Sequence, residues 1–230
     1  MKILLIRNNE YSGTEIKTAI LNLGFTIYDV TKPEQISISE INNQGKCDIE
    51  FFKIPIHKFE RIYFLNTPFK ENNSTNYKDN IFEYCELDAS IISALQYNSG
   101  KIINAGLISI SRSILNKYFF VFLFKKIGWE LHNSIFNGPN FLSQKKEHQI
   151  NILISRTNFS FYPYYDVYFK DYTKIQELIF NTQKVMWEKK IDILNVSCKI
   201  QNESISIVNI SQYFQGIGNE LLSKSLKEIL

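Results

Sequence analysis

Apolar and polar positions alternate at the start of the chain in a pattern typical of an α/β unit. Lys2 to Ile6 is a short apolar run that predicts a strand in the middle of a parallel sheet. Glu15 to Leu23 carries its apolar residues on one helical face, and Thr14 is the expected cap. Phe25 to Val30 then predicts a second strand. This β-α-β order predicts an α/β sheet with right-handed crossovers.

The same two periodicities predict the elements that follow. Further strands are expected at 59–65, 101–104 and 150–154, and helices at 81–97, 113–127, 173–189 and 218–230. Lys70 to Asn80 is rich in Asn, Lys and Ser and predicts a surface loop. The chain thus divides into two predicted domains, residues 1–112 and 113–230.

The last part of the chain predicts a β-hairpin. Between Ile191 and Phe214, two alternating runs flank a short polar turn of Gln, Asn and Glu. Ser197 lies on the first expected strand, and Asn209 and Ser211 lie on the second.

Composition bounds the class of protein. The chain has 230 residues, of which 44% are apolar and 14% aromatic, so it can bury a core. Its formal charge is +3, and the lysines are scattered among nearly as many acids. Nucleic-acid binding requires a basic stripe or face and is therefore not expected.

Cysteines, histidines and apolar runs narrow the function classes further. Cys47, Cys85 and Cys198 have neither a metal-site spacing nor a disulfide pattern, so we expect reduced thiols. The three histidines lie in different segments without metal-ligand neighbours. Apolar runs stay well below the ~20 residues of a membrane span, so we expect a cytoplasmic protein without membrane contact.

The order of several residues between Glu86 and Trp129 carries a family resemblance. Glu86 lies on a helix, Asn104 ends a strand, Asn116 and Lys117 open the next helix, and Gly128 follows it. This order resembles the join between the pre-ATP-grasp domain and the core of peptide-modifying ATP-grasp ligases. The relatives meant are graspetide (microviridin) enzymes and ribosomal-protein glutamate ligases. The resemblance implies a pre-ATP-grasp parallel-sheet domain at 1–112, followed at 113–230 by a truncated ATP-grasp-like α+β core.

Two departures from that family pattern bear on catalysis. In the family, an Asp on the first strand of the terminal hairpin and a Glu and an Asn on the second hold magnesium. The resemblance sets Ser197, Asn209 and Ser211 at these positions, so we expect no metal site and no catalytic residue. The family's Gly-rich nucleotide loop also has no counterpart, since no glycine occurs between Gly138 and Gly216.

Residues 155–169 form an aromatic segment with two interpretations. The first is a strand and turn that cover a core. The second is a surface that binds a peptide or a partner protein, because Tyr, Phe and Arg are frequent interface anchors. Its candidate residues are Arg156, Phe159, Tyr162, Tyr164, Tyr165 and Tyr168.

These observations lead to a hypothesis with two alternatives. The chain is expected to be an ATP-grasp pseudoenzyme without cofactors that binds a precursor peptide or an active ligase or maturase, with a homodimer left open. The first alternative is an active carboxylate-amine or hydroxyl peptide ligase that uses ATP and Mg and is completed by a partner chain. The second is a small-molecule-binding α/β module with its ligand near Asn8, Gly13 and Asn104.

Overall fold

The chain forms two compact units, each with its own sheet architecture. The structure, a computed structural model, describes residues 1–8, 11, 13–41, 47–68, 77–110, 113–132, 149–162, 172–201, 204–212, 214 and 217–230. The first unit comprises Met1–Ser109 with Leu230, and the second comprises Ile110–Ile229. The first contains a parallel sheet and a small antiparallel sheet, and the second an antiparallel sheet, which confirms the predicted α/β class.

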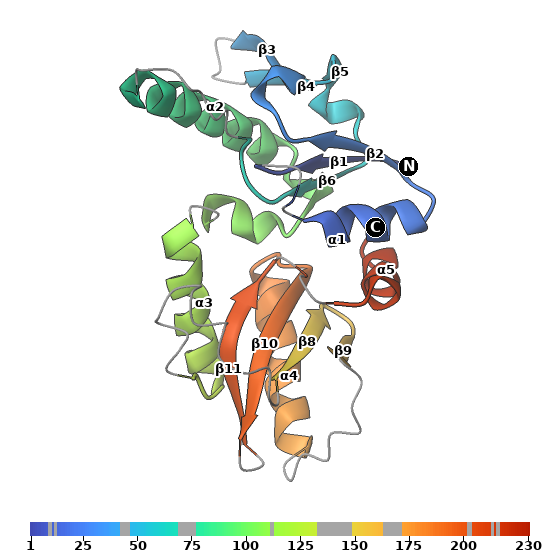
Figure 1. Cartoon of the computed structure of the whole chain (residues 1–230), viewed down its shortest axis with the longest axis vertical. Helices are drawn as coiled ribbons and strands as arrows, with labels where there is room; N and C mark the ends of the chain where they lie inside the picture. Colours follow the sequence, from blue (N-terminus) through green and yellow to red (C-terminus); the bar gives the residue numbers. More distant parts are fainter. Residues whose placement is uncertain are drawn as a thin grey trace. The chain divides into compact units, whose positions relative to one another are not determined.

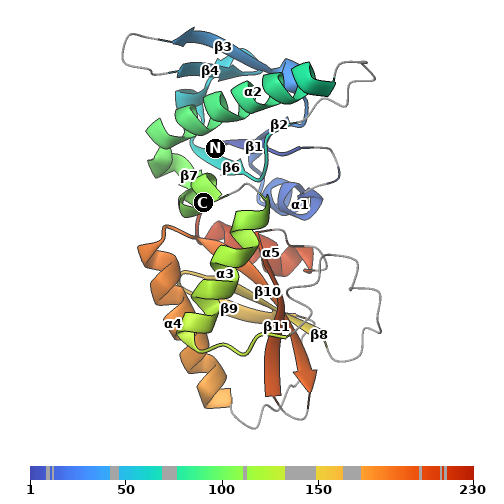
Figure 2. The ribbon, with the colours of Figure 1, turned by 90° about the vertical axis from the view of Figure 1, so that its left-hand side faces the viewer.

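A four-stranded parallel sheet with the order β2-β1-β6-β7 organises the first unit. Figures 1 and 2 show α1 on one face of this sheet and α2 on the other. The predicted strands and helices are present, but α2 begins inside the segment that we expected to be a loop. Their bounds are β1 (Lys2–Ile6), α1 (Thr14–Asn22), β2 (Thr26–Val30), β6 (Arg61–Phe64), α2 (Tyr77–Tyr97) and β7 (Ile102–Ile103).

The start of α1 corrects one prediction. Gly13, and not Thr14, is the N-cap, and its backbone has a φ of 70° in the left-handed region that favours glycine. Thr14 lies in the first turn, where its hydroxyl donates to the carbonyl oxygen of Tyr11 at 2.7 Å. A Cβ at Gly13 would overlap Cδ1 of Leu65, so a larger residue here would have to displace that side chain and adopt a strained backbone.

A three-stranded antiparallel sheet, which the sequence analysis did not predict, covers part of the α2 face. Its central strand β4 contacts α2, and apolar residues of both elements join those of the parallel sheet in one buried cluster. Between β4 and β5, Phe52 and Lys53 have φ values of 54° and 61°. The strands are β3 (Ile36–Ile41), β4 (Cys47–Phe51) and β5 (Ile54–Pro55).

The second unit is built on an antiparallel sheet with the order β11-β10-β8-β9. Figures 1 and 2 show α3 and α4 along one face of this sheet. Short 3-10 turns at 33–35, 56–58, 99–101 and 105–110 complete the described elements of the chain. The bounds in the second unit are α3 (Ser113–Ile127), β8 (Gln149–Ser155), β9 (Phe159–Tyr162), α4 (Tyr172–Glu188), β10 (Ile193–Gln201), β11 (Ser204–Ser211) and α5 (Asn219–Lys227).

Alternation along β10 separates the two faces of that sheet. Leu194, Val196 and Cys198 occupy one face and are fully buried. The helices α3 and α4 contact each other. Trp129, two residues past the end of α3, donates from Nε1 to Oγ1 of Thr182 on α4 at 2.9 Å. The buried indole therefore links the segment after α3 to α4 through a satisfied polar contact.

Candidate functional site

Three neutral polar side chains form a row across the sheet of the second unit. Ser197 on β10 lies opposite Asn209 on β11 and opposite Asn151 on β8. Paired residues in a sheet point to the same face, and the Ser197 hydroxyl donates to Oδ1 of Asn151 at 2.7 Å. Asn209 is exposed and the other two residues are half-buried. We call Asn151, Ser197 and Asn209 the polar row.

A β-bulge sets which residues reach the polar row. Pairing shifts from Ser197 opposite Asn209 to Cys198 opposite Ile207, so Val208 is the extra residue of β11. Ser211 lies at the next position on the same face as Asn209, opposite Asn195. The hairpin thus brings two of the three predicted ligand positions into a direct pair. Asn151 was not predicted, although it is the one amide inside the apolar run of β8.

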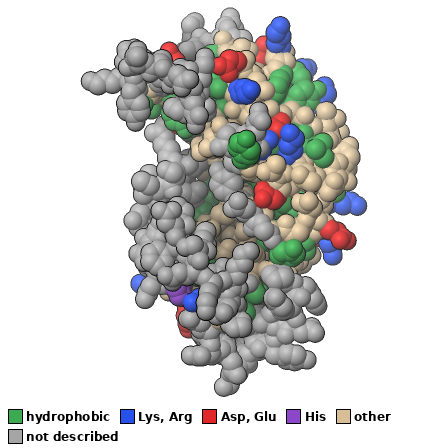
Figure 3. Space-filling view, viewed as in Figure 1, with side chains coloured by type: hydrophobic (Ala, Val, Ile, Leu, Met, Phe, Trp, Pro, Cys, Tyr) green, Lys and Arg blue, Asp and Glu red, His purple; other side chains and the backbone are tan. Residues whose placement is uncertain are grey.

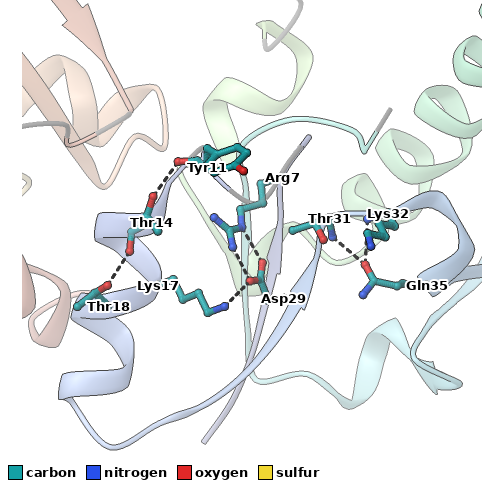
Figure 4. Close-up of polar contacts among 9 residues, drawn as sticks. All are labelled: Arg7, Tyr11, Thr14, Lys17, Thr18, Asp29, Thr31, Lys32 and Gln35. Carbon is teal, nitrogen blue, oxygen red and sulfur yellow. Dashed lines mark hydrogen bonds and ion pairs between the residues drawn. The ribbon is translucent and has the colours of Figure 1, made fainter. Parts of the chain in front are cut away.

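The first unit carries a buried charge cluster at the carboxyl ends of β1 and β2 (Figure 4). Arg7 is 1% exposed. It donates from Nε to Oδ1 of Asp29 at 2.7 Å and from NH2 to Oδ2 at 2.5 Å. The ammonium of Lys17 on α1 lies 2.8 Å from the same Oδ2. Burial raises the pKa of Asp29, but hydrogen bonds and charge from Arg7 and Lys17 outweigh it and lower the pKa below its usual value.

The residues predicted to border a small-molecule crevice lie at this same edge of the parallel sheet. Asn104 directly follows β7 with a φ of 59°, is 2% exposed, and places Nδ2 3.5 Å from the Tyr63 hydroxyl. Leu65 lies against Gly13 on the α1 side. Both positions are thus engaged by the chain's own side chains, and the prediction of a ligand near Asn8, Gly13 and Asn104 stays a prediction.

Arg156 lies in the turn between β8 and β9 and makes three contacts. Its Nε donates to the carbonyl oxygen of Ile191 at 3.1 Å, and its NH2 lies 3.0 Å from Oδ1 of Asp192. The guanidinium also stacks over the Trp187 ring at 5.1 Å from the centroid. These contacts join the β8–β9 turn to the segment between α4 and β10. The predicted binding role of Arg156 must therefore compete with a structural one.

The aromatic segment is described in part. Phe159 and Tyr162 are the end residues of β9 and are half-buried, whereas Tyr164, Tyr165 and Tyr168 lie outside the described residues. A cavity of about 680 Å³ lies beside β9 and α5, and we call it the β9–α5 cavity. Its lining comprises residues 158–162, Tyr172, Gly218, Glu220, Leu221 and Lys224. The last four come from α5 and its cap, which the sequence analysis did not single out.

No protein-family model and no curated protein sequence matches the chain. Solved structures match it over nearly its whole length. The macrocyclase MdnC from Microcystis aeruginosa MRC, bound with precursor peptide MdnA, has a TM-score of 0.66 and 10% identity, covering 100% of this chain and 99% of that one. A RiPP-associated ATP-grasp ligase from Chryseobacterium gregarium, in complex with ADP and a leader and core peptide, matches with a TM-score of 0.63 and 10% identity. The match covers 100% of this chain and 96% of that one. The ATP-grasp ligase PsnB, complexed with minimal precursor, Mg and ADP, matches with a TM-score of 0.62 and 9% identity. The match covers 99% of this chain and 97% of that one.

This chain has the ATP-grasp ligase fold. The predicted resemblance is thereby confirmed at the level of the fold. The predicted loss of the Gly-rich nucleotide loop concerns the segment between Trp129 and β8. Most of that segment lies outside the described residues, so this loss stays a prediction.

The polar row does not fit the magnesium ion that an ATP-grasp ligase uses. Magnesium prefers carboxylate oxygens in octahedral geometry, whereas the row offers one hydroxyl and two amides without charge. In the described ranges, no three His, Cys, Asp or Glu side chains gather as a metal site would require. The row can donate and accept hydrogen bonds but carries no charge of its own.

The buried thiol, the surface charges and the helices of the described residues do not indicate a further catalytic group. Burial raises the pKa of the Cys198 thiol far above its usual value, so the thiol stays protonated. On the face drawn in Figure 3, basic and acidic side chains of the described residues are interspersed. None of the helices in the described parts of the chain is long and apolar enough to cross a bilayer.

Proposed function

We propose that this protein is a catalytically inactive ATP-grasp-fold protein that binds a peptide or a protein partner in a peptide-modification (RiPP-type) pathway. The partner would be a precursor peptide, or an active ligase or maturase. One observation carries the proposal: Ser197 and Asn209 pair directly on the hairpin where the resemblance locates metal-binding carboxylates.

The electrostatics of the second unit support this proposal. Acyl-phosphate formation relies on metal ions and cations that neutralise the developing charge on the phosphoryl group. The polar row is neutral, and Arg156 in the β8–β9 turn is already paired with Asp192. A chain with these groups can hold a peptide through hydrogen bonds and apolar contacts, neither of which requires nucleotide.

The fold comparison supports the choice of partner. The MdnC and C. gregarium structures are complexes with precursor, leader or core peptides. For this chain, the aromatic residues of β9 provide rigid apolar surface of the kind that anchors peptides. Homodimerisation stays a prediction, which sedimentation of the purified protein checks.

Calorimetry with ATP, with and without Mg²⁺, tests the proposal on the purified chain. PsnB, whose structure holds Mg and ADP, is the positive control. We expect no heat of binding at millimolar nucleotide for this chain and clear heat for PsnB. Magnesium-dependent ATP binding or ATP turnover by the pure protein contradicts the proposal. Turnover that requires an added partner chain would instead favour the alternative of a ligase completed by that partner.

A further inference from the structure

The β9–α5 cavity is lined by aromatic rings on its strand side. Phe159 and Phe161 form an edge-to-face pair with ring centroids 5.7 Å apart and an interplanar angle of 84°. Tyr162 at the end of β9 and Tyr172 at the start of α4 also line the cavity. Tyr172 is 43% exposed, so its ring is accessible from outside. The cavity therefore offers several aromatic faces and edges to an occupant.

Specific contacts hold the two walls of the cavity together. Oε1 of Glu228, just past the end of α5, accepts from Nδ2 of Asn158 at 3.3 Å, and its Oε2 accepts from the Thr157 hydroxyl at 3.2 Å. At the other end of α5, a Cβ on Gly218 would lie 3.1 Å from Cε2 of Tyr162. A glycine at the helix cap thus leaves room for the Tyr162 ring, and the cavity has defined walls at both ends.

Two opposite charges lie on the helix side of the cavity. Glu220 and Lys224 are one helical turn apart on α5, and both are exposed. Side chains at this spacing lie about 5–6 Å apart at their Cβ atoms. Neither forms an ion pair with another described residue, and the hydroxyls of Ser160 and Tyr162 form no hydrogen bond within the described ranges. The described lining of the cavity thus combines apolar rings with charged and hydroxyl groups.

These features fit one class of ligand. We propose that the β9–α5 cavity binds an aromatic side chain of a peptide whose neighbouring charged residues are recognised by Glu220 and Lys224. The proposal rests on the proposed function, since it specifies how that peptide is recognised. A volume of about 680 Å³ exceeds that of a single side chain and matches a short peptide segment.

An aromatic occupant is favoured over an aliphatic one of similar size. Edge-to-face and offset contacts add about 0.5–1.5 kcal/mol per pair beyond the buried area, which corresponds to roughly twofold to tenfold in affinity. The charges add direction, because Lys224 attracts a carboxylate and Glu220 attracts a cationic side chain. A peptide with an aromatic residue between an acidic and a basic one therefore matches the cavity in both respects.

Calorimetry with capped tripeptides tests the proposal on the full chain. The probes are acetyl-Asp-Phe-Lys-amide, its Leu counterpart and free phenylalanine. We expect the Phe peptide to bind about twofold to tenfold more tightly than the Leu peptide. Equal affinity for the two peptides, or no binding at millimolar concentration, overturns the proposal. Free phenylalanine that binds as tightly as the peptide overturns the peptide assignment and makes the cavity an amino-acid site.

Matched variants locate the binding. Tyr172→Ala should weaken binding of the Phe peptide about tenfold, whereas Phe180→Ala, which removes another exposed aromatic of α4, should leave it unchanged. Lys224→Glu should weaken binding of acetyl-Asp-Phe-Lys-amide, and Lys227→Glu on the same helix should not. Similar losses for both members of either pair would place the peptide elsewhere. If the peptide does not bind the cavity and ATP does not bind either, the cavity proposal is wrong but the proposed inactive function is not contradicted. If ATP binds with Mg²⁺, the proposed inactive function is itself contradicted.

Discussion

The polar side chains at the sheets of the two units differ in charge and in exposure. In the first, buried Arg7 and half-buried Asp29 are charged and paired within the chain, with Lys17 beside them. In the second, the polar row is neutral and reaches solvent at Asn209. Charges that pair with each other inside a protein serve its stability, and those that a ligand could use must stay accessible. The comparison teaches that the charged pair of the first unit is held inside the fold, whereas the polar row of the second unit carries no charge.

Removing the carboxylate of the charge cluster should give the largest effect. Asp29→Asn leaves the guanidinium of Arg7 buried without a counter-charge, and such losses lower the free energy of unfolding by about 3–5 kcal/mol. Lys17→Ala is the matched control, because Lys17 is 39% exposed and should contribute less than ~1 kcal/mol. Urea denaturation of both variants measures the difference. Similar small losses for both would mean that the pair contributes little to stability.

Acid should weaken the same cluster. The pKa of Asp29 is lower in the folded chain than its ordinary value of 3.8, so its contribution is complete above that value. It is lost as the pH falls below 3.8 and through the folded-state pKa. The difference in unfolding free energy between the wild type and Asp29→Asn should therefore shrink in acid. Denaturation curves at neutral pH and at several acidic pH values check this, and a constant difference contradicts it.

Introducing acids into the polar row should create cation binding. The double variant Ser197→Asp with Asn209→Glu sets two carboxylates on directly paired positions of the hairpin. A divalent cation at ten times its Kd should then raise the free energy of unfolding by about 1.4 kcal/mol. Lys199→Asp with Ser206→Glu, another directly paired position, is the control. Thermal unfolding with Mn²⁺ measures both, and equal response would show that any acid pair suffices.

The smallest expected effect distinguishes two roles of Arg156. Arg156→Ala removes a half-exposed ion pair with Asp192 and a stack on Trp187, so the unfolding free energy should fall by about 1 kcal/mol. Lys184→Ala, which removes a cation stacked on the exposed ring of Phe180, should have less effect. If Arg156→Ala abolishes peptide binding without loss of stability, recognition and not structure explains the residue.

Strong periodicity made most of the fold predictable. The apolar run of β1, the helical face of α1 and the alternation of β10 gave these elements from the sequence. The β3–β5 sheet was missed, although Ile36–Ile41 alternates. The turn at Phe52 and Lys53, which joins β4 to β5, lacks the Asn or Gly that normally signals positive φ. The cap at Gly13 was misassigned because Thr14 matches the usual cap chemistry.

The candidate site was predictable only where the residues lie on one hairpin. Ser197 and Asn209 are close in sequence, so their strand pattern indicates a pair. Asn151 comes from another strand, and its position depends on the order β10-β8, which local periodicity does not specify. Lys224 and Glu220 resemble ordinary solvated helix residues, and only the tertiary fold places them beside β9.

The two tryptophans provide an intrinsic optical readout of the second unit. Trp129 is 3% exposed and Trp187 is 64% exposed. An indole in an apolar site emits at shorter wavelength than one in water, and acrylamide quenches the exposed one first. Trp129→Phe and Trp187→Phe would therefore give two single-tryptophan proteins. One would report on the packing between α3 and α4, and the other on the stacking of Arg156, without any added label.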